Sequence, residues 1–114
     1  MVSGKHFILD VEGVEKRKLV DKQIMYKVLS ELPEMVNMNK LTDPLIVEGV
    51  SYNPGLTGVI IIETSNIILH TFQNSGKLSL DIFSIKPIDE EKVISYLNRH
   101  YKFKVLRRQL IDRL

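Results

Sequence analysis

The sequence predicts an α+β fold, a two-layer sandwich in which two helices cover one face of a mainly antiparallel sheet. Two segments space their apolar residues as helices do, and the other apolar segments are short, alternating or branched. Turn residues separate these segments. The 114 residues suffice for a single domain, 1–114, with one core. The predicted order is β-α-β-β-β-α-β, with both helices on the same face.

The N-terminal half contributes a strand, a helix and a second strand. Residues 6–11 are apolar and branched, which predicts a strand. Residues 17–32 carry apolar side chains at the spacing of one helical face. Pro33 is expected to end this helix or to follow it closely, because proline disfavours helical backbone at the preceding residue. Residues 45–52 alternate as a strand, which the turn sequence Asn-Pro-Gly at 53–55 is expected to end.

The C-terminal half contributes further strands and a second helix. Strands are expected at 58–63, 67–72, 78–85 and 102–110. The first two form a hairpin with Ser65 at its tip. Asp89 is suited to cap the second helix, whose apolar face carries Val93, Leu97 and Tyr101.

Composition excludes several classes of chemistry and partner. The chain has no cysteine, so it has no disulfide, thiolate metal site or cysteine nucleophile. The three histidines lack compact ligand spacing, and no metal is expected. The net charge of +2 is too small to indicate nucleic acid. No apolar run approaches the ~20 residues that cross a bilayer, and no signal peptide is apparent, so we expect a cytoplasmic protein without membrane contact.

The middle strands predict a homodimer. Residues 59–62 and 67–69 are apolar at both alternating positions, so both faces of the sheet carry apolar side chains. Two helices cover only one face, and a second copy of the chain is expected on the other.

Ser65 and His70 are the residues that best suit chemistry. They lie five residues apart, but no acidic residue stands at triad spacing and no G-x-S-x-G motif surrounds the serine, so a hydrolase is not indicated. A hydrogen-bonded sheet histidine remains an equal interpretation of His70. A serine at a strained turn can instead attack the preceding carbonyl, and elimination from the resulting ester leaves a pyruvoyl group, which is an electron sink.

The block 57–72, continued to Asp81-Ile82-Phe83, resembles the central block of the prokaryotic S-adenosylmethionine decarboxylases. Gly4-Lys5-His6 and the apolar strand ending at Asp10 are similar to that family's start. The resemblance implies one two-layer domain over 1–114 and membership of a pyruvoyl-dependent lyase family of polyamine (spermidine) biosynthesis.

The resemblance also implies roles for five residues. Ser65 matches the pyruvoyl precursor, so the cofactor would be a pyruvoyl group made from Ser65 only if the chain cleaves itself. His70 and Thr57 match residues that assist processing. Asn74 and Phe72 match substrate-binding positions.

Departures from the family pattern predict a divergent member with a degenerate catalytic site. Thr64 and Asn66 replace the glutamate and histidine that flank the family's serine. Ile85 stands where the family has a catalytic cysteine, and it cannot transfer a proton. Asn74 replaces an acidic residue that binds ribose hydroxyls, which removes a charge-assisted hydrogen bond. We therefore expect a regulatory partner of a genuine decarboxylase paralogue, or a binder of a small nucleoside or amine ligand.

Two alternatives stay open. An active pyruvoyl-dependent decarboxylase would act on S-adenosylmethionine or on an amino acid such as arginine or ornithine, with Ser84 or Thr71 in place of the cysteine. An RNA-binding module would use the basic and aromatic residues of the C-terminal strand, although no RNP motif is present. The residues of that second alternative are Tyr101, Lys102, Phe103, Lys104, Arg107, Arg108 and Arg113.

Overall fold

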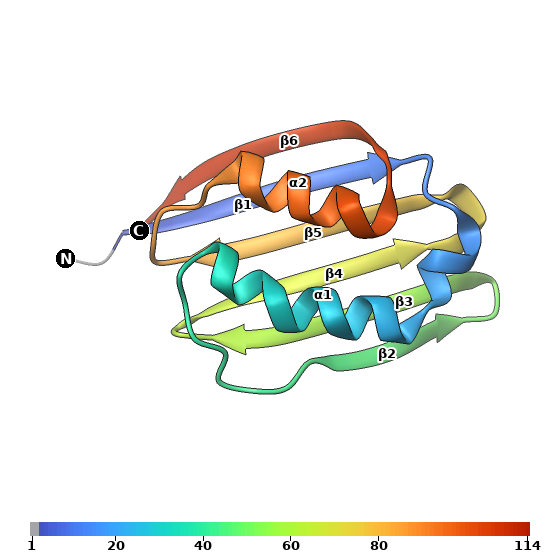
Figure 1. Cartoon of the computed structure of the whole chain (residues 1–114), viewed down its shortest axis with the longest axis horizontal. Coiled ribbons are helices and arrows are strands. Elements are labelled where there is room, and N and C mark those ends of the chain that lie inside the picture. The colour runs from blue at the N-terminus through green and yellow to red at the C-terminus, as the bar shows by residue number, and fades with distance from the viewer. Residues whose placement is uncertain (1–2) are drawn as a thin grey trace.

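The computed structural model describes residues 3–114, which form a six-stranded sheet and two α-helices (Figure 1). The strands are β1 (Gly4–Glu12), β2 (Leu45–Val50), β3 (Asn53–Ile62), β4 (Ser65–Phe72), β5 (Lys77–Ser84) and β6 (Lys104–Arg113). The helices are α1 (Lys22–Met35) and α2 (Glu90–Tyr101), with short 3-10 helices η1 (Lys16–Val20) and η2 (Gln73–Ser75).

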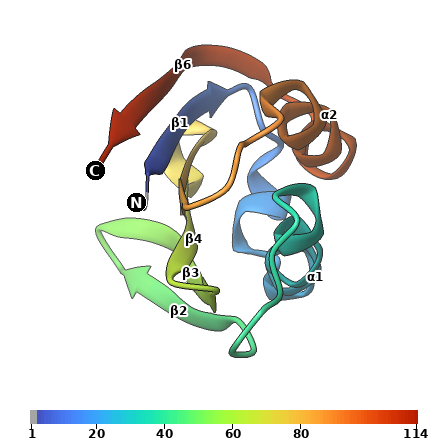
Figure 2. The ribbon, with the colours of Figure 1, turned by 90° about the vertical axis from the view of Figure 1, so that its left-hand side faces the viewer.

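The strands lie in the order β2-β3-β4-β5-β1-β6, and every neighbouring pair is antiparallel. Both helices cover the same face of the curved sheet and leave the other face open (Figure 2). The predicted α+β fold class and the placement of both helices are thus confirmed. The predicted order names three strands between the helices, whereas the structure has four, β2 to β5. Each of the four strand segments expected between residues 45 and 85 forms one of them.

The core lies between the helices and the sheet. Inward residues of β4 and β5 alternate with half-buried outward residues, as a strand covered on one face requires. Helix α1 packs very close to β3 at Gly58, where an added Cβ would lie 2.5 Å from Leu29 Cδ1 and 2.7 Å from Met25 Sδ. The side chains of Leu29 and Met25 therefore pack directly over the backbone of Gly58, and a larger residue there would displace their ends.

The predicted helix at 17–32 is two elements. Asp21 separates η1 from α1, and its carboxylate accepts hydrogen bonds from the backbone N–H groups of Gln23 at 2.9 Å and Ile24 at 3.1 Å. The prediction that Pro33 ends the helix is wrong, since α1 continues to Met35. Pro33 lies in the last turn, where the chain loses one backbone hydrogen bond while the proline ring is buried against the core.

The prediction that residues 53–55 end the second strand is also wrong. The turn lies at 51–52, and β3 already begins at Asn53. An added Cβ at Gly55 would lie 2.0 Å from the carbonyl oxygen of Thr71, so this glycine lets β3 pass close to β4.

The two helices are joined by a polar contact between their side chains. The Tyr96 hydroxyl of α2 donates to the carboxylate of Glu31 in α1. This hydrogen bond holds the pKa of Glu31 below its usual value, while burial raises the pKa of Tyr96 well above its ordinary range.

Thr71 joins three elements at the far end of β4. Its side chain is buried, and its hydroxyl donates to the carbonyl oxygen of Leu19 in η1. The backbone N–H of Leu56 in β3 donates to the same hydroxyl at 2.8 Å. A buried hydroxyl that serves as donor and acceptor fixes η1 against the sheet.

We predict that Thr71→Val lowers the free energy of unfolding by about 1–3 kcal/mol, because it leaves the buried Leu56 N–H without a partner. Urea denaturation measures the change. Thr64→Val is the matched control, since Thr64 is exposed and its hydroxyl donates only to the adjacent Glu63 carbonyl. Equal stability of the two variants would contradict the role of Thr71.

Candidate functional site

Ser65 begins β4 directly after a two-residue turn. β3 ends at Ile62, which pairs with Ser65, and Glu63-Thr64 make the turn. The predicted hairpin is confirmed, but Ser65 is not at its tip as expected, because β4 begins at Ser65, two residues before the expected start of that strand. Thr64 adopts a left-handed conformation with φ of 45°, which is uncommon for a β-branched residue. The peptide bond that precedes Ser65 therefore follows a strained residue.

The Ser65 side chain points toward the helix-covered face and is 7% exposed. The backbone N–H of Ile85 donates to Ser65 Oγ at 3.3 Å. Ile85 follows the last residue of β5, so the position that resembles the family's cysteine does lie beside the serine. Its apolar side chain packs against the core and supplies no proton.

The two hydroxyls considered as replacements for the cysteine serve the backbone instead. Ser84 is fully buried, donates to the Lys86 carbonyl at 2.7 Å and accepts from the Lys86 N–H at 3.0 Å. Thr71 lies six residues along β4 from Ser65, about 20 Å at the rise of a strand, and holds η1 as described above.

Thr57 and His70 form a pair on the open face of the sheet. They are register partners in β3 and β4, and Thr57 Oγ1 lies 2.9 Å from His70 Nδ1. Phe72, two residues further along β4, points to the same face. A cavity of about 230 Å³ brings these three residues together, and Val50, Asn53 and Leu56 also line it.

Ser65 and His70 do not meet within one chain. A spacing of five residues places them on opposite faces of β4, and at about 3.3 Å per residue they lie about 16 Å apart along the strand. Asn74 is exposed in η2 and does not line the cavity. The structure thus groups Thr57, His70 and Phe72 and separates both Ser65 and Asn74 from them.

Sequence reasoning missed Asn53 as a lining residue. The sequence predicts a turn at this residue, and only the position of β3 beside β4 brings it near His70. No sequence signal marks this proximity, since it depends on the pairing register of the two strands.

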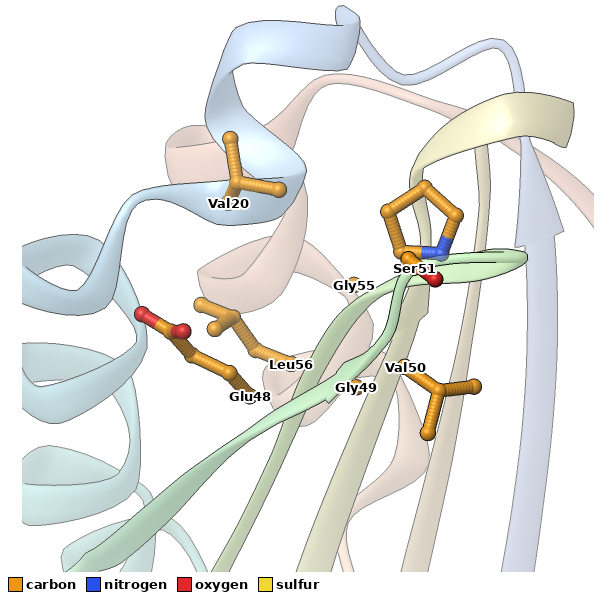
Figure 3. Close-up of a pocket in the computed structure, with 8 residues that line it drawn as sticks. Val20, Glu48, Gly49, Val50, Ser51, Gly55 and Leu56 are labelled. Carbon is orange, nitrogen blue, oxygen red and sulfur yellow. The ribbon is translucent and has the colours of Figure 1, made fainter.

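A second cavity of about 200 Å³ lies at the hairpin of β2 and β3, beside η1 (Figure 3). Val20, Glu48 and Leu56 contribute to its lining, and in Figure 3 the side chains of Glu48 and Val50 project in opposite directions. The register shifts between these two residues, and such a bulge breaks the strand's alternation. The Glu48 carboxylate lies 2.7 Å from Lys22 Nζ on the helix side.

The basic strand β6 offers little of the aromatic surface that RNA recognition needs. Tyr101 is 1% exposed, so its ring is not available for base stacking. Arg108 forms ion pairs with Glu90 and Glu91. Among residues 3–114, no group of three or more His, Asp or Glu side chains is arranged to hold a metal. No helix in the same range is long and apolar enough to cross a membrane.

The six-stranded antiparallel sheet with both helices on one face defines a small two-layer α+β protein. The chain belongs to the S-adenosylmethionine decarboxylase family, whose model matches residues 5–114.

Individual relatives agree with this assignment. The S-adenosylmethionine decarboxylase proenzyme of Archaeoglobus fulgidus is 24% identical over 115 residues, which cover 99% of each chain. The proenzyme of the same description from Clostridium botulinum (strain Loch Maree / Type A3) is 28% identical over 104 residues, or 90% of this chain and 86% of the relative. The crystal structure of the adenosylmethionine decarboxylase from Aquifex aeolicus matches the fold with a TM-score of 0.74 and 18% identity, over 98% of this chain and 89% of that one.

The residues present do not fit a pyruvoyl group formed within one chain. Proenzymes of this family generate that group by self-cleavage, which needs groups that move protons near the serine. Here the neighbour of Ser65 is Ile85, whose apolar side chain moves no proton, and His70 of the same chain is on the other face of β4.

Proposed function

We propose that this protein is a single-domain member of the S-adenosylmethionine decarboxylase family that keeps the fold but does not process itself efficiently. It acts as a ligand-binding or regulatory protein, and a decarboxylase paralogue of the same family is its proposed partner. The observation that carries this proposal is Ile85 beside Ser65, because the position next to the serine offers only a backbone N–H and an aliphatic side chain.

Loss of proton transfer argues against an efficient decarboxylase. A general acid contributes about 10²–10⁴-fold to a rate, and Ile85 supplies none. The ribose contact expected at Asn74 is weakened twice, since the amide is neutral and lies in exposed η2 outside the cavity. Both defects point away from turnover of S-adenosylmethionine.

We further propose that the open face of the sheet forms a homodimer. Its apolar side chains gather over β2, β3 and β4, where Leu45, Val47 and Ile61 are at least half exposed. Its polar side chains gather over β1 and β5, where His6 contacts Asp81 and Ser79 contacts Asp10. A two-fold axis between the sheets and perpendicular to the strands packs the apolar half on itself. A two-fold axis parallel to the strands and through the centre of the sheet would instead place the apolar half of one copy on the polar half of the other.

That perpendicular axis has a consequence for the site. It lays the two copies of β4 antiparallel to each other, so the Ser65 end of one strand lies over the other end of its counterpart. The turn before Ser65 then approaches His70 of the partner subunit. The separation of Ser65 from His70 within one chain is thus understandable in a dimer.

We predict that the purified protein remains a single chain of 13.2 kDa, because the residue beside Ser65 is Ile85, whose aliphatic side chain cannot transfer a proton. Intact mass under denaturing conditions measures this. Fragments with the masses of residues 1–64 and 65–114, lost in Ser65→Ala, would contradict the proposal. They would support the alternative of an active pyruvoyl-dependent enzyme, which the strained φ of Thr64 favours.

We predict little carbon dioxide release from labelled S-adenosylmethionine by the wild-type protein. Ile85→Cys with Asn74→Glu, extended by Thr64→Glu and Asn66→His, is expected to restore part of the processing or activity. Ser65→Ala in the restored background is the control and is expected to abolish it. Substantial wild-type release would overturn the proposal, whereas turnover of arginine or ornithine would move the function to an amino-acid decarboxylase.

We predict a dimer at micromolar concentration by light scattering, and a monomer for Val47→Glu with Ile61→Glu, since charges on the apolar half oppose its burial. Both residues are at least half exposed in the single chain, so the substitutions spare its core. Tyr26→Glu on helix α1 is the control and is expected to stay dimeric. A monomeric wild-type protein would refute this interface.

A further inference from the structure

We infer that the outer edge of β2 binds an extended polypeptide segment of a partner protein as an added strand, and that one apolar side chain of this segment enters the groove between β2 and α1. This inference rests on the proposed regulatory function and specifies where and how a protein partner binds. It concerns the edge and the helix side of the sheet, which the second copy proposed for the open face does not cover.

β2 is an edge strand whose outer side is available for pairing. It stands at one end of the strand order, and among residues 3–114 no strand lies beyond it (Figure 1). Five of its six residues are exposed, and Glu48 is its only charged residue. Edge strands of soluble proteins are usually protected by charged side chains, by proline or by a covering element. The interior of β2 has little of this protection.

The opposite edge of the sheet is protected by charge. Half of the ten residues of β6 are charged, and four of these five are cationic. Such side chains oppose the approach of another strand, since they would lose water on pairing. Strand addition is therefore expected at β2 and not at β6.

The backbone groups that face the outer edge of β2 belong to Ile46 and Glu48. The carbonyl oxygen of Ile61 in β3 accepts a hydrogen bond from the Leu41 N–H at 2.8 Å, on the side of β3 where β2 lies. Backbone groups alternate in direction along a strand, so residues 57 and 59 also face β2, where they pair with residues 45 and 47. The residues between and after these, Ile46 and Glu48, direct their N–H and C=O groups outward.

A groove of about 450 Å³ lies beside this edge on the helix side. This volume is within the roughly 300–1,000 Å³ of ligand sites and is ample for one large side chain. Ile46 lines the groove while its backbone groups face the outer edge. The residue opposite Ile46 in an added strand therefore has its side chain at the groove. The lining residues are Lys22, Gln23, Tyr26, Lys27, Pro44 and Ile46.

The charges around the groove favour a neutral, apolar side chain. Lys22 Nζ lies 2.7 Å from the Glu48 carboxylate, and Lys27 Nζ lies 3.2 Å from that of Glu31. A charged side chain would have to compete with one of these pairs, whereas an apolar one leaves both intact. Tyr26 is 47% exposed, so a side chain that covers its ring removes apolar surface from water. The partner segment is thus extended and carries a large apolar residue at this position.

The test uses a short synthetic peptide that alternates threonine with valine, has phenylalanine in place of the central valine, and carries charged residues at both ends for solubility. The control peptide has the same side chains, but its central backbone nitrogens are methylated and cannot donate hydrogen bonds. Binding to the full-length protein is measured by fluorescence anisotropy, and amide hydrogen exchange locates the peptide.

We expect saturable binding of the first peptide and at least about tenfold weaker binding of the methylated one, because the methyl groups remove backbone hydrogen bonds. Exchange of the Ile46 and Glu48 amides is expected to slow when the first peptide binds. Equal affinities of the two peptides, or slower exchange at β6 in place of β2, would overturn the inference.

Variants test the groove separately from the edge. Tyr26→Ala is expected to weaken binding of the first peptide several-fold. Tyr52→Ala is the matched control, since Tyr52 is 85% exposed in the turn beyond β2 and does not line the groove. A peptide with lysine in place of the phenylalanine is expected to bind the wild-type protein more weakly. Equal binding by the two variants, or undiminished binding of the lysine peptide, would refute the role of the groove.

A second copy of this chain at the edge is the competing outcome. Pairing of β2 with β2 of another copy would give assemblies larger than a dimer in light scattering without peptide, and this result would overturn the inference. The outcome is distinguishable from that of the processing experiment. An uncleaved chain that binds no peptide would leave the proposed lack of processing intact and refute this inference, and a cleaved chain that binds the peptide would do the reverse.

Discussion

The alternation of side chains along β4 is the constraint on which the candidate site depends. A strand has a period of two, so Ser65, Ile67, Leu69 and Thr71 face the helices, while Asn66, Ile68, His70 and Phe72 face outward. The inward set is held by burial, and a slip of one residue would expose it. The odd spacing between Ser65 and His70 therefore separates them in the folded chain, however close they are in sequence.

Burial on one face also explains why the site divides into a closed part and an open part. Helix α1 comes close to the sheet at Gly58, and the Thr71 hydroxyl fixes η1 beside it, so the Ser65 side lies in a packed interior. No helix covers the other face, where the pair Thr57–His70 lies beside a cavity (Figure 2). The packed side restricts chemistry at the serine, and the open side is available for a ligand or a second copy.

The polar groups near these two regions have different tasks. Around Ser65, hydroxyls bond to backbone groups: Ser65 accepts from the Ile85 N–H, and Ser84 contacts Lys86. Such bonds satisfy buried groups and stabilise the fold. Around His70 the polar side chains point outward and are incompletely buried, so they can exchange water for a ligand. Ile85 thus contributes a backbone N–H and an apolar side chain to the surroundings of the serine.

The amino-acid sequence alone determined the α+β class, most of the strands, the Asp89 cap of α2 and the resemblance of the Ser65 block to the family. These depend on local periodicity and residue type, which neighbouring residues display directly. It did not determine that η1 and α1 are separate, that Pro33 lies inside α1, or that Asn53 begins β3. The packing of those segments outweighs the local preferences of Pro33 and Asn53.

Only the tertiary structure decided which candidate residues share a site. It placed Ile85 beside Ser65, joined Thr57 to His70, and added Asn53 to the cavity while leaving Asn74 outside. Each of these relations depends on the register between strands that are distant along the chain, or on which face a side chain occupies. Register is fixed by the burial of a whole sheet face against the helices, which is a property of the assembled layers and not of any single segment.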